Sequence, residues 1–504
     1  MPTTIDPAIQ HIVVRAADSV RVRSDTASVV ERADGTLLVA YHSYSHGPEG
    51  GGDFGAAKIY LAESADSGRH WTNERMVADI IPGDLNVMSP FLCQVEDEIL
   101  LGYVRNHSAG DTSMHLHRSR DGGTSFGDSA PIWEHAGAYR IQGGASSLVR
   151  LNSGRLILPI QSCDEVWVAD ENQSIGTYFS DDGGHTWTPS ANNIGLPMRG
   201  AMEPSIAQRA DGSLLMSMRT QLGAVFFAES DDGGEHWSRA QTSGLRSPES
   251  CTCLRRLPDS EDLVLFWNDA EYLYGHHHFG IRSPLSAAIS SDGGRSWCKI
   301  GDIDAGDCML TNLSCTFLSS GAAIITYLTT PDPEIENGVY RGTPSTKAER
   351  DAQFVMELKA ALIPQAWFTC TDAFRAQQSA VKPAEEKSRH PSALPPLTRQ
   401  AIDAHLNRYC EERVPEHVRG KIRLLFKVRG LSVTLFESRS LWNDPTQWVD
   451  GKIAQFRYDL ETGTWALYCA DRNGRWQRYD PQAPSKDFDD LLQEIERDPT
   501  GIFW

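Results

Sequence analysis

Apolar positions in the first two thirds of the chain form short runs that come in pairs, with a polar turn inside each pair. Examples are SVVERADGTLLVAYH at residues 28–42 and PSIAQRADGSLLMSMRT at residues 204–220. Runs of Val, Ile, Leu and Thr that flank Asp-Gly or Ser-Gly are typical of β-hairpins. Six such pairs are present, and they begin at Ser24, Met88, Gly143, Met202, Pro248 and Thr311.

A short polar motif follows five of these pairs and recurs every 50 to 61 residues. It starts with Ser, has Asp and Gly in the middle and ends with Trp or Phe, and its copies are Ser64–Trp71, Ser119–Phe126, Ser180–Trp187, Ser230–Trp237 and Ser290–Trp297. Ser and Asp side chains accept hydrogen bonds from the backbone of their own turn, and Gly supplies a positive φ. The motif therefore predicts a turn between the third and fourth strands of a repeated unit.

These five copies resemble the Asp boxes of the sialidase superfamily over roughly the first three quarters of the chain. The resemblance implies a six-bladed β-propeller, and the six strand pairs agree with six blades. We therefore expect an all-β, sialidase-like propeller at residues 1–375. Near its end, Thr346 and Glu349 match a capping box, which predicts a helix with Phe354, Leu358 and Leu362 on one face.

The remaining residues have a different pattern. Residues 376–396 are rich in Pro, Ala, Ser and charge, which is typical of a linker. Residues 397–504 contain a helical segment, five strand-like runs with turns at Glu-Thr-Gly and Arg-Asn-Gly, and a last helical segment. They predict a small α+β domain, and they resemble a small bacterial domain family of unknown function.

Net charge narrows the choice of partner. The formal net charge of −20 argues against nucleic acid and against an anionic membrane surface, but a local group of arginines can still bind an anionic sugar. The first residues do not resemble a signal peptide, and no apolar run is long enough to span a bilayer, so a cytoplasmic location is expected. Cys251, Cys253 and the other cysteines are interpreted as buried thiols, with no cofactor or metal expected. The oligomeric state stays open.

The central funnel of a propeller is where chemistry is expected, because the innermost strand of every blade points one end at it. Alignment of the pairs by their turns predicts that the first strands contribute Asp25, Ser89, Gly144, Glu203, Glu249 and Asn312. The second strands contribute His42, Arg105, Gln161, Arg219, Asn268 and Leu328. Most of these are polar in otherwise apolar strands, which predicts a polar pocket.

The resemblance also implies roles. Sialidases share an arginine triad that grips the substrate carboxylate, a tyrosine nucleophile assisted by a glutamate, and an aspartate acid/base. Glu203 resembles that glutamate, and Arg219 and Arg282 resemble the second and third arginines. The planar guanidinium group of arginine binds a carboxylate through two parallel hydrogen bonds.

Two departures from the family pattern change the expected chemistry. Asp25, Thr26 and Ala27 stand where the family has Arg-Ile-Pro, and Arg105 is the candidate to replace the missing arginine in space. Where the tyrosine is expected, the chain has Thr311, Asn312 and Leu313, with Tyr327 and Tyr340 as nearby candidates.

Two carboxylates that flank a glycosidic bond are sufficient to cleave it. Asp25, Glu203 and Glu249 are therefore the predicted catalytic residues, with Asp25 and Glu203 as the acid/base pair. The predicted substrate-binding residues are His42, Arg105, Gln161, Arg219, Asn268, His276, His278, Arg282 and Asn312. The histidines can also be interpreted as metal ligands or as acid/base groups, although sugar hydrogen bonding is favoured.

The first hypothesis is a sialidase-like glycoside hydrolase of the exo-α-sialidase type, with altered chemistry, that acts on an acidic sugar or glycan. A non-catalytic carbohydrate-binding propeller is the main alternative. A polysaccharide lyase on uronate-containing glycans and an interaction scaffold also stay open.

Overall fold

The computed structural model describes residues 5–47, 52–127, 129–142, 148–273, 276, 278–332, 334–336, 339–340, 356–369, 394–414, 418–440, 448–459, 462–470, 476–479, 481–498 and 503. The chain divides into two compact units, Met1–Ala373 and Phe374–Trp504. No helix in these ranges is both long enough and apolar enough to cross a membrane.

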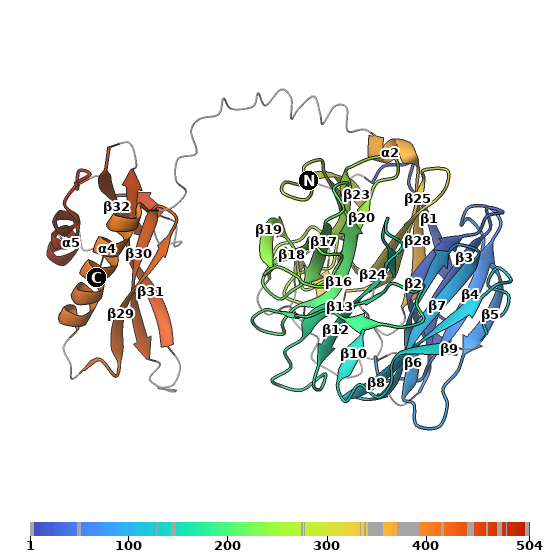
Figure 1. Cartoon of the computed structure of the whole chain (residues 1–504). Coiled ribbons are helices and arrows are strands. Elements are labelled where there is room, and N and C mark those ends of the chain that lie inside the picture. The colour runs from blue at the N-terminus through green and yellow to red at the C-terminus, as the bar shows by residue number, and fades with distance from the viewer. Residues whose placement is uncertain are drawn as a thin grey trace. The chain divides into compact units, whose positions relative to one another are not determined.

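In the described part of the first unit, six larger antiparallel sheets follow one another along the chain (Figure 1). The first contains β2 (Arg21–Glu31), β3 (Leu37–Ser45), β4 (Ala57–Ser64) and β5 (Thr72–Ala78), and the second contains β6 (Asn86–Val95), β7 (Glu98–Ser108), β8 (Asp111–Ser119) and β9 (Ser129–Trp133). The third contains β10 (Tyr139–Ile141), β11 (Val149–Arg150), β12 (Leu156–Cys163), β13 (Ser174–Ser180), β14 (Thr188–Pro189) and β15 (Ile194–Gly195).

The fourth sheet contains β16 (Met202–Gln208), β17 (Leu214–Arg219), β18 (Ala224–Ser230) and β19 (Gln241–Arg246). The fifth contains β20 (Cys253–Arg256), β21 (Leu263–Asn268), β22 (Leu285–Ser290) and β23 (Cys298–Asp304). The sixth contains β24 (Cys308–Phe317), β25 (Ala323–Pro331), β28 (Glu357–Ile363) and β1 (Gln10–Arg15). Short elements β26 (Ile335–Glu336), β27 (Val339–Tyr340) and α2 (Gln365–Thr369) complete the unit.

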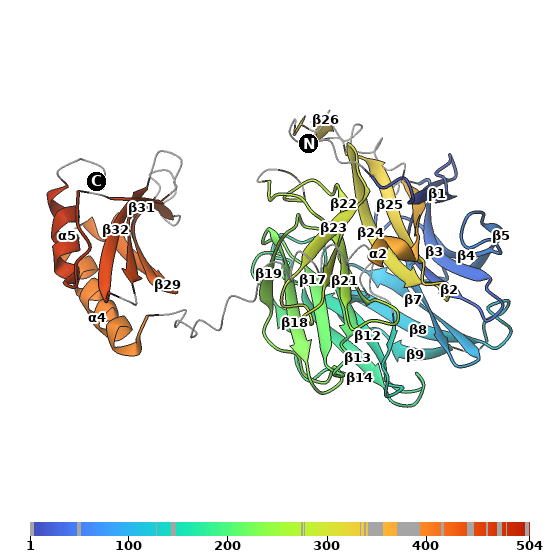
Figure 2. The ribbon, with the colours of Figure 1, turned by 90° about the horizontal axis from the view of Figure 1, so that it is seen from above.

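The sixth sheet unites the beginning and the end of this unit. Strand β28 pairs on one side with β25 and on the other with the N-terminal strand β1, and β1 lies beside the sixth-sheet strands in Figure 2. The helix expected to include Leu358 and Leu362 is therefore wrong, because both residues lie in β28. Residues four apart share a face in a strand as well as in a helix, so the spacing alone did not separate the two. Thr346, Glu349 and Phe354 lie outside the described residues.

The Asp-box turns join the third and fourth strands of the first five sheets, as the sequence predicted. In the third copy, the Ser180 hydroxyl donates to Asp182 at 2.7 Å and accepts from the Gly184 N–H at 2.8 Å. Gly184 has φ +88°, and a Cβ there would come within 2.9 Å of Leu116 in the preceding sheet. Each box is therefore a hydrogen-bonded turn, and the glycine at its fifth position also lets it lie close to the neighbouring sheet.

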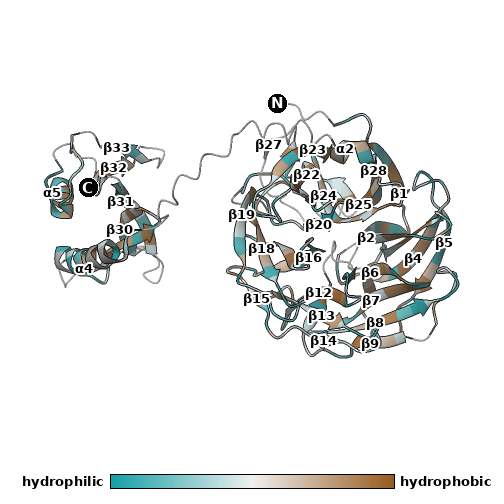
Figure 3. Cartoon of the chain, turned by 45° about the horizontal axis from the view of Figure 1, so that its top comes forward, coloured by the Kyte–Doolittle hydropathy of each residue, from teal (hydrophilic) through white to brown (hydrophobic). Residues whose placement is uncertain are grey.

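Most neighbouring sheets contact one another mainly through their innermost strands, which lie around a common centre in Figure 3, and the second and third sheets also meet through β8 and β10. The Leu92 N–H of β6 donates to the Ser28 hydroxyl of β2 at 3.0 Å. On the other side of β2, the Thr316 hydroxyl of β24 donates to the Val29 carbonyl at 2.8 Å. The first sheet therefore contacts both the second and the sixth, and buried Val, Leu and Ile side chains fill the space between adjacent sheets.

The second unit is a five-stranded antiparallel sheet with two helices on one face. Its strands are β29 (Ile422–Arg429), β30 (Ser432–Ser440), β31 (Trp448–Asp459), β32 (Thr464–Ala470) and β33 (Trp476–Arg478), and its helices are α4 (Pro396–Arg413) and α5 (Phe488–Arg497). Leu406 of α4 and Leu491 of α5 pack with Leu435 and Phe456 of the sheet. The predicted order of helix, five strands and helix is confirmed.

Candidate functional site

Four of the inner strands have the same irregularity where they approach the centre. In β2, β6, β16 and β24 two residues lie opposite one on the partner strand, which is a β-bulge. The first bulge residue has a positive φ in each case: Thr26 (47°), Ser89 (51°), Glu203 (44°) and Asn312 (52°). Bulges re-aim side chains. All four residues line one cavity of about 500 Å³.

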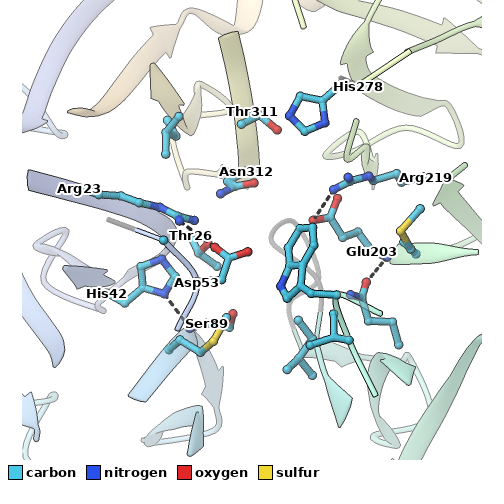
Figure 4. Close-up of a pocket in the computed structure, with 18 of the residues that line it drawn as sticks. Arg23, Thr26, His42, Asp53, Ser89, Glu203, Arg219, His278, Thr311 and Asn312 are labelled. Carbon is cyan, nitrogen blue, oxygen red and sulfur yellow. Dashed lines mark hydrogen bonds and ion pairs between the residues drawn. The ribbon is translucent and has the colours of Figure 1, made fainter. Parts of the chain in front are cut away.

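This cavity has a size typical of small-ligand sites. Its charged or ionisable lining residues include Arg23, His42, Asp53, Arg199, Glu203, Arg219, His278 and Arg282. Figure 4 shows Arg23, His42 and Asp53 on one side and Glu203 and Arg219 on the opposite side. Cationic groups therefore outnumber carboxylates on its surface, in a chain whose overall charge is negative.

The first side of the cavity is organised around Asp25, which is fully buried. Arg23 Nε donates to Asp25 Oδ2 at 2.8 Å, and Asn312 Nδ2 donates to the same oxygen at 2.8 Å. Burial raises the pKa of Asp25, but the charge of Arg23, the neighbouring His42 and the hydrogen bonds from Arg23 and Asn312 together outweigh burial and leave the pKa below its usual value. Asp25 is therefore an ionised anchor for Arg23.

His42 lines the cavity, yet both of its ring nitrogens are engaged. Its Nδ1 accepts from the Ser89 N–H at 2.9 Å, so Nε2 carries the proton and faces Asp25. Burial lowers the pKa of His42 to about 4. The ring is therefore neutral near pH 7 and has no lone pair available for a substrate.

The opposite side is organised around Glu249, which is 2% exposed. Its Oε1 accepts from Arg219 at 2.8 Å and from Arg199 at 2.9 Å. Burial raises the pKa of Glu249, but the charge of Arg219 and the nearby His278 and Gln221 together outweigh burial and hold the pKa well below the usual range. Glu249 therefore holds two arginines whose other atoms line the cavity.

Glu203 has a different environment from Glu249. Its Oε1 lies 3.2 Å from an Arg219 nitrogen, while Oε2 has no hydrogen-bond partner among the described residues. The Glu203 backbone N–H donates to Gln161 Oε1 at 2.5 Å, which helps to hold the bulge. Oε2 of Glu203 is therefore a buried oxygen without a hydrogen-bond partner in the described structure, although the residue itself lines the cavity.

Arg282 completes the cationic side. Its Nε and Nη2 donate to the Glu249 carbonyl oxygen at 3.0 and 2.8 Å. Burial, together with the charge of Arg219, lowers the pKa of Arg282 to about 10. At the rim, the guanidinium of Arg199 lies 4.6 Å from the ring centre of Trp167, whose side chain is largely exposed. Trp167 is thus an aromatic surface beside the cavity.

The cavity brings together seven of the predicted site residues: His42, Gln161, Glu203, Arg219, His278, Arg282 and Asn312. Asp25 and Glu249 lie just behind it, where they hold arginines. The other three predicted binding residues do not line it. Arg105 pairs with Asp84 at 2.5 Å, Asn268 is buried and donates to two backbone carbonyls, and His276 Nε2 lies 3.2 Å from Asp332.

Two of these differences concern which positions in neighbouring sheets are equivalent. Strand register matches Val104, not Arg105, to Arg219, because the turn between β6 and β7 is shorter than the turn between β16 and β17. In β2 Thr26, not Asp25, is the first bulge residue and therefore the equivalent of Glu203; each lies six positions before the arginine of its Arg-Ala-Asp-Gly turn. Counting from the turn therefore identifies Thr26, whereas the shorter turn after β6 shifts the count for Arg105.

Sequence reasoning missed Arg23 and Asp53. Arg23 precedes Asp25 by two positions in β2, and it donates to Asp53 at 2.7 Å. Asp53 follows a run of glycines, and its side chain is 34% exposed. The sequence feature that could have identified Asp53 is an acidic residue in a glycine-rich loop beside an inner hairpin.

The tyrosine candidates do not line the cavity in the described structure. Tyr327 is fully buried, and its hydroxyl donates to Asp304 at 2.7 Å. The side chain of Tyr340 lies outside what the structure describes. Tyr139 is the one tyrosine among the described lining residues, and it is 4% exposed. Within the described ranges, no group of three His, Cys, Asp or Glu side chains is arranged to hold a metal ion.

Family models match both parts of the chain. A model described as a BNR repeat-like domain matches residues 35–335. A model described as a domain of unknown function, DUF3024, matches residues 394–504, in agreement with the resemblance seen in the sequence. No curated protein matches the chain significantly.

Solved structures with a similar fold include several sialidases. A Trypanosoma rangeli sialidase is 11% identical, with 94% of this chain and 85% of that chain covered and a TM-score of 0.55. The Hadza microbial sialidase Hz136 is 20% identical, with 63% and 66% covered and a TM-score of 0.51. A Dyadobacter fermentans protein of unknown function is 17% identical, with 71% and 100% covered and a TM-score of 0.53. These structures show a shared sialidase-like fold. The BNR repeat-like model matches more than half of this chain, so the chain belongs to the BNR repeat-like domain family.

Proposed function

We propose that the protein is a sialidase-like glycoside hydrolase that binds a carboxylate-bearing sugar in the cavity. One observation carries the proposal: the two opposite sides each pair an arginine with a carboxylate, Arg23 with Asp53 and Arg219 with Glu203 (Figure 4). A cavity with cations for the substrate and carboxylates for proton transfer has the groups that hydrolysis of an acidic glycoside requires.

We also infer that the six sheets are the blades of a propeller. The Asp box of the first sheet supports this, because Gly68 lies against Ile324 of the sixth sheet, just as Gly184 lies against Leu116 of the second. The hydrogen bond from the Ser314 hydroxyl to the Ala27 carbonyl, at 2.5 Å, is a second contact between the first and sixth sheets. A propeller makes all six inner strands converge on one site.

The arginines are the groups that bind the substrate carboxylate in this proposal. Guanidinium forks bind carboxylates through two parallel hydrogen bonds, and their buried anchors keep the forks in place. Arg23 is held by Asp25, and Arg219 is held by Glu249. The neutral groups Thr26, Ser89, Gln161 and Asn312 then provide donors and acceptors for sugar hydroxyls.

Asp53 and Glu203 are the proposed catalytic residues. Glu203 accepts a proton from a water as the water oxygen bonds to the anomeric carbon. The glycosidic C–O bond breaks, and the leaving oxygen takes a proton from Asp53. Asp53 replaces Asp25 in the proposed acid role, because Asp25 is fully buried behind the cavity whereas Asp53 lines it. The position of Glu203 in the lining of the cavity, opposite Asp53, supports its assignment as the base (Figure 4).

The experiment is hydrolysis of fluorogenic sialosides, uronides and neutral glycosides by the full chain. Glu203→Gln and Asp53→Asn are each expected to lower kcat by about 100-fold or more, as loss of a general acid or base does. Glu235→Gln and Asp181→Asn are matched controls, since both side chains pair with Arg155 in the Asp-box region. Hydrolysis that both cavity variants retain would refute the assignment.

A non-catalytic binding function is the second candidate, and the residues at the expected tyrosine position favour it. Thr311 and Asn312 line the cavity there, whereas Tyr327 is bonded to Asp304. Saturable sugar binding by calorimetry without turnover, retained in Glu203→Gln, would support this candidate. A lyase would instead release an unsaturated, ultraviolet-absorbing product, but the engaged nitrogens of His42 disfavour it as the base.

A further inference from the structure

The C-terminal sheet has one face that no described element covers. Burial alternates along β29, with Leu424 facing the helices and the residues on either side of it exposed or partly exposed. Leu435, Phe456 and Leu467 mark the helix-facing side of the next strands. The opposite side chains of β29–β33 form what we call the open face.

The open face is basic. Strand register assigns to it Arg423, Lys427, Arg429, Lys452, Arg457 and Arg478. The same register assigns two carboxylates to this face, Asp450 and Asp459, near the two ends of β31. The middle of the face therefore carries positive charge in a chain with a net charge of −20.

Aromatic rings hold several of these cations. The guanidinium carbon of Arg423 lies 3.9 Å from the ring centre of Trp448, and that of Arg457 lies 4.1 Å from the ring centre of Tyr468. Cation–π contacts of this kind orient a guanidinium without neutralising it. Arg457 is further positioned by a 2.8 Å hydrogen bond from its Nε to Gln455.

Arg423 and Arg457 differ from arginines of the first unit in the groups that they contact. There, Arg32 pairs with Glu63 and Arg155 pairs with Asp181. In the described part of the C-terminal sheet, Arg423 and Arg457 form no ion pair with a carboxylate, and their partners are aromatic or amide groups. Uncompensated, oriented guanidinium groups on one face are complementary to a ligand with several negative charges.

The spacing of the cations favours widely separated charges on that ligand. Arg429 and Arg457 are opposite the same residue, Ser432, on its two sides, so they are two strand spacings apart, about 10 Å. In duplex DNA each strand carries one phosphate about every 3.4 Å of helix axis. Single-stranded nucleic acids also need free ring faces for base stacking, whereas Arg423 and Arg457 occupy the ring faces here. A polysaccharide with one carboxylate per sugar fits these features better than a nucleic acid does.

We propose that the open face binds a carboxylate-bearing polysaccharide. The proposal rests on the contacts of β29–β33 and does not depend on hydrolysis in the cavity. A polysaccharide bound to this unit would raise the effective concentration of its sugar ends for a site on the same chain. The C-terminal unit would then be a substrate-retaining module.

The test measures binding of fluorescein-labelled polysialic acid and alginate to the full chain by fluorescence anisotropy. Arg423→Gln combined with Arg457→Gln is expected to raise the Kd about tenfold, and added salt is expected to weaken binding of the parent. Arg413→Gln combined with Arg439→Gln is the control, because these arginines already pair with Glu496 and Glu437. The control is expected to change the Kd less than twofold.

Three results would overturn the proposal: no binding of either polymer, equal weakening in both double variants, or tighter binding of single-stranded RNA than of the polysaccharides. A further variant, Arg423→Lys with Arg457→Lys, keeps the charge and checks that lost affinity is not unfolding; intermediate affinity is expected. Hydrolysis of a small fluorogenic glycoside is measured in parallel. Polymer binding without hydrolysis overturns only the proposed enzyme activity, and hydrolysis without polymer binding overturns only the open-face proposal.

Discussion

Asn312 and Asp25 are 287 positions apart in the chain, yet Asn312 Nδ2 donates to Asp25 Oδ2 at 2.8 Å. The bond connects β24 of the sixth sheet to β2 of the first, directly beside the cavity. It also fixes the carboxylate that holds Arg23. Asp25 is therefore a positioning residue, and its effect on a ligand is exerted through Arg23.

Asp25→Asn should lower the free energy of unfolding by about 3 kcal/mol, because it leaves Arg23 without its buried partner. Urea denaturation followed by tryptophan fluorescence measures the change. Asp34→Asn is the control, since Asp34 lies in an exposed turn and its amide can still accept from the Thr36 N–H. Equal midpoints for the two variants would show that the buried pair does not stabilise the fold.

The stability of the protein should fall between pH 6.5 and pH 4 because of His42. Its pKa is lowered to about 4 by burial, so in this window the unfolded chain binds a proton that the folded chain does not. The contribution of neutral His42 to the free energy of unfolding is thus fully present above pH 6.5. It is lost as pH falls toward 4, and the total loss is on the order of 3 kcal/mol.

Urea midpoints across this pH range measure the effect for the parent and for His42→Asn. The variant should have a flatter pH dependence than the parent. His46→Asn removes an exposed histidine and should keep the parent profile. His117, whose pKa is also lowered to about 4 by burial, accounts for part of the slope that His42→Asn retains. Identical slopes in the parent and His42→Asn would contradict the assignment.

Arg23→Gln and Arg105→Gln distinguish the site seen in the structure from the site expected from the alignment. Arg23 lines the cavity, whereas Arg105 pairs with Asp84 away from it. Loss of a charged hydrogen bond costs about 1.5–3 kcal/mol, so Arg23→Gln should weaken binding of a sugar carboxylate about 10- to 100-fold. Titration calorimetry with sialic acid and glucuronic acid checks this, and a larger loss in Arg105→Gln would reverse the conclusion.

Gly184→Ala should destabilise the protein more than Gly212→Ala. Both glycines have a positive φ, +88° and +90°, so each alanine pays about 1–2 kcal/mol for its backbone conformation. A Cβ at Gly184 would also lie 2.9 Å from Leu116, whereas nothing lies within 4 Å of one at Gly212. This crowding should add about 1–3 kcal/mol. Thermal unfolding of both variants measures the difference, and equal melting temperatures would argue against close packing of the Asp box on its neighbour.

Local patterns predicted the hairpins well because their determinants are close together in the chain. Ser180, Asp182 and Gly184 form their turn largely through bonds to one another, so the motif identifies it without knowledge of the rest of the fold. The segment with Leu358 and Leu362 was predicted wrongly for the converse reason. Its strand conformation depends on pairing with β1, more than 340 residues earlier in the chain.

The sequence by itself determined the repeated sheets, the Asp-box turns and the α+β character of the C-terminal residues, since all of these follow from periodicity and turn chemistry. Only the tertiary structure decided which polar side chains meet. The bulges re-aim Thr26 and Glu203 into the cavity. Contacts between separate strands and loops bring Arg23 to Asp53 and bury Asp25 behind these two residues. A bulge changes which side of a strand faces the centre, and it is formed by pairing with the partner strand, which the apolar pattern of a single strand does not show.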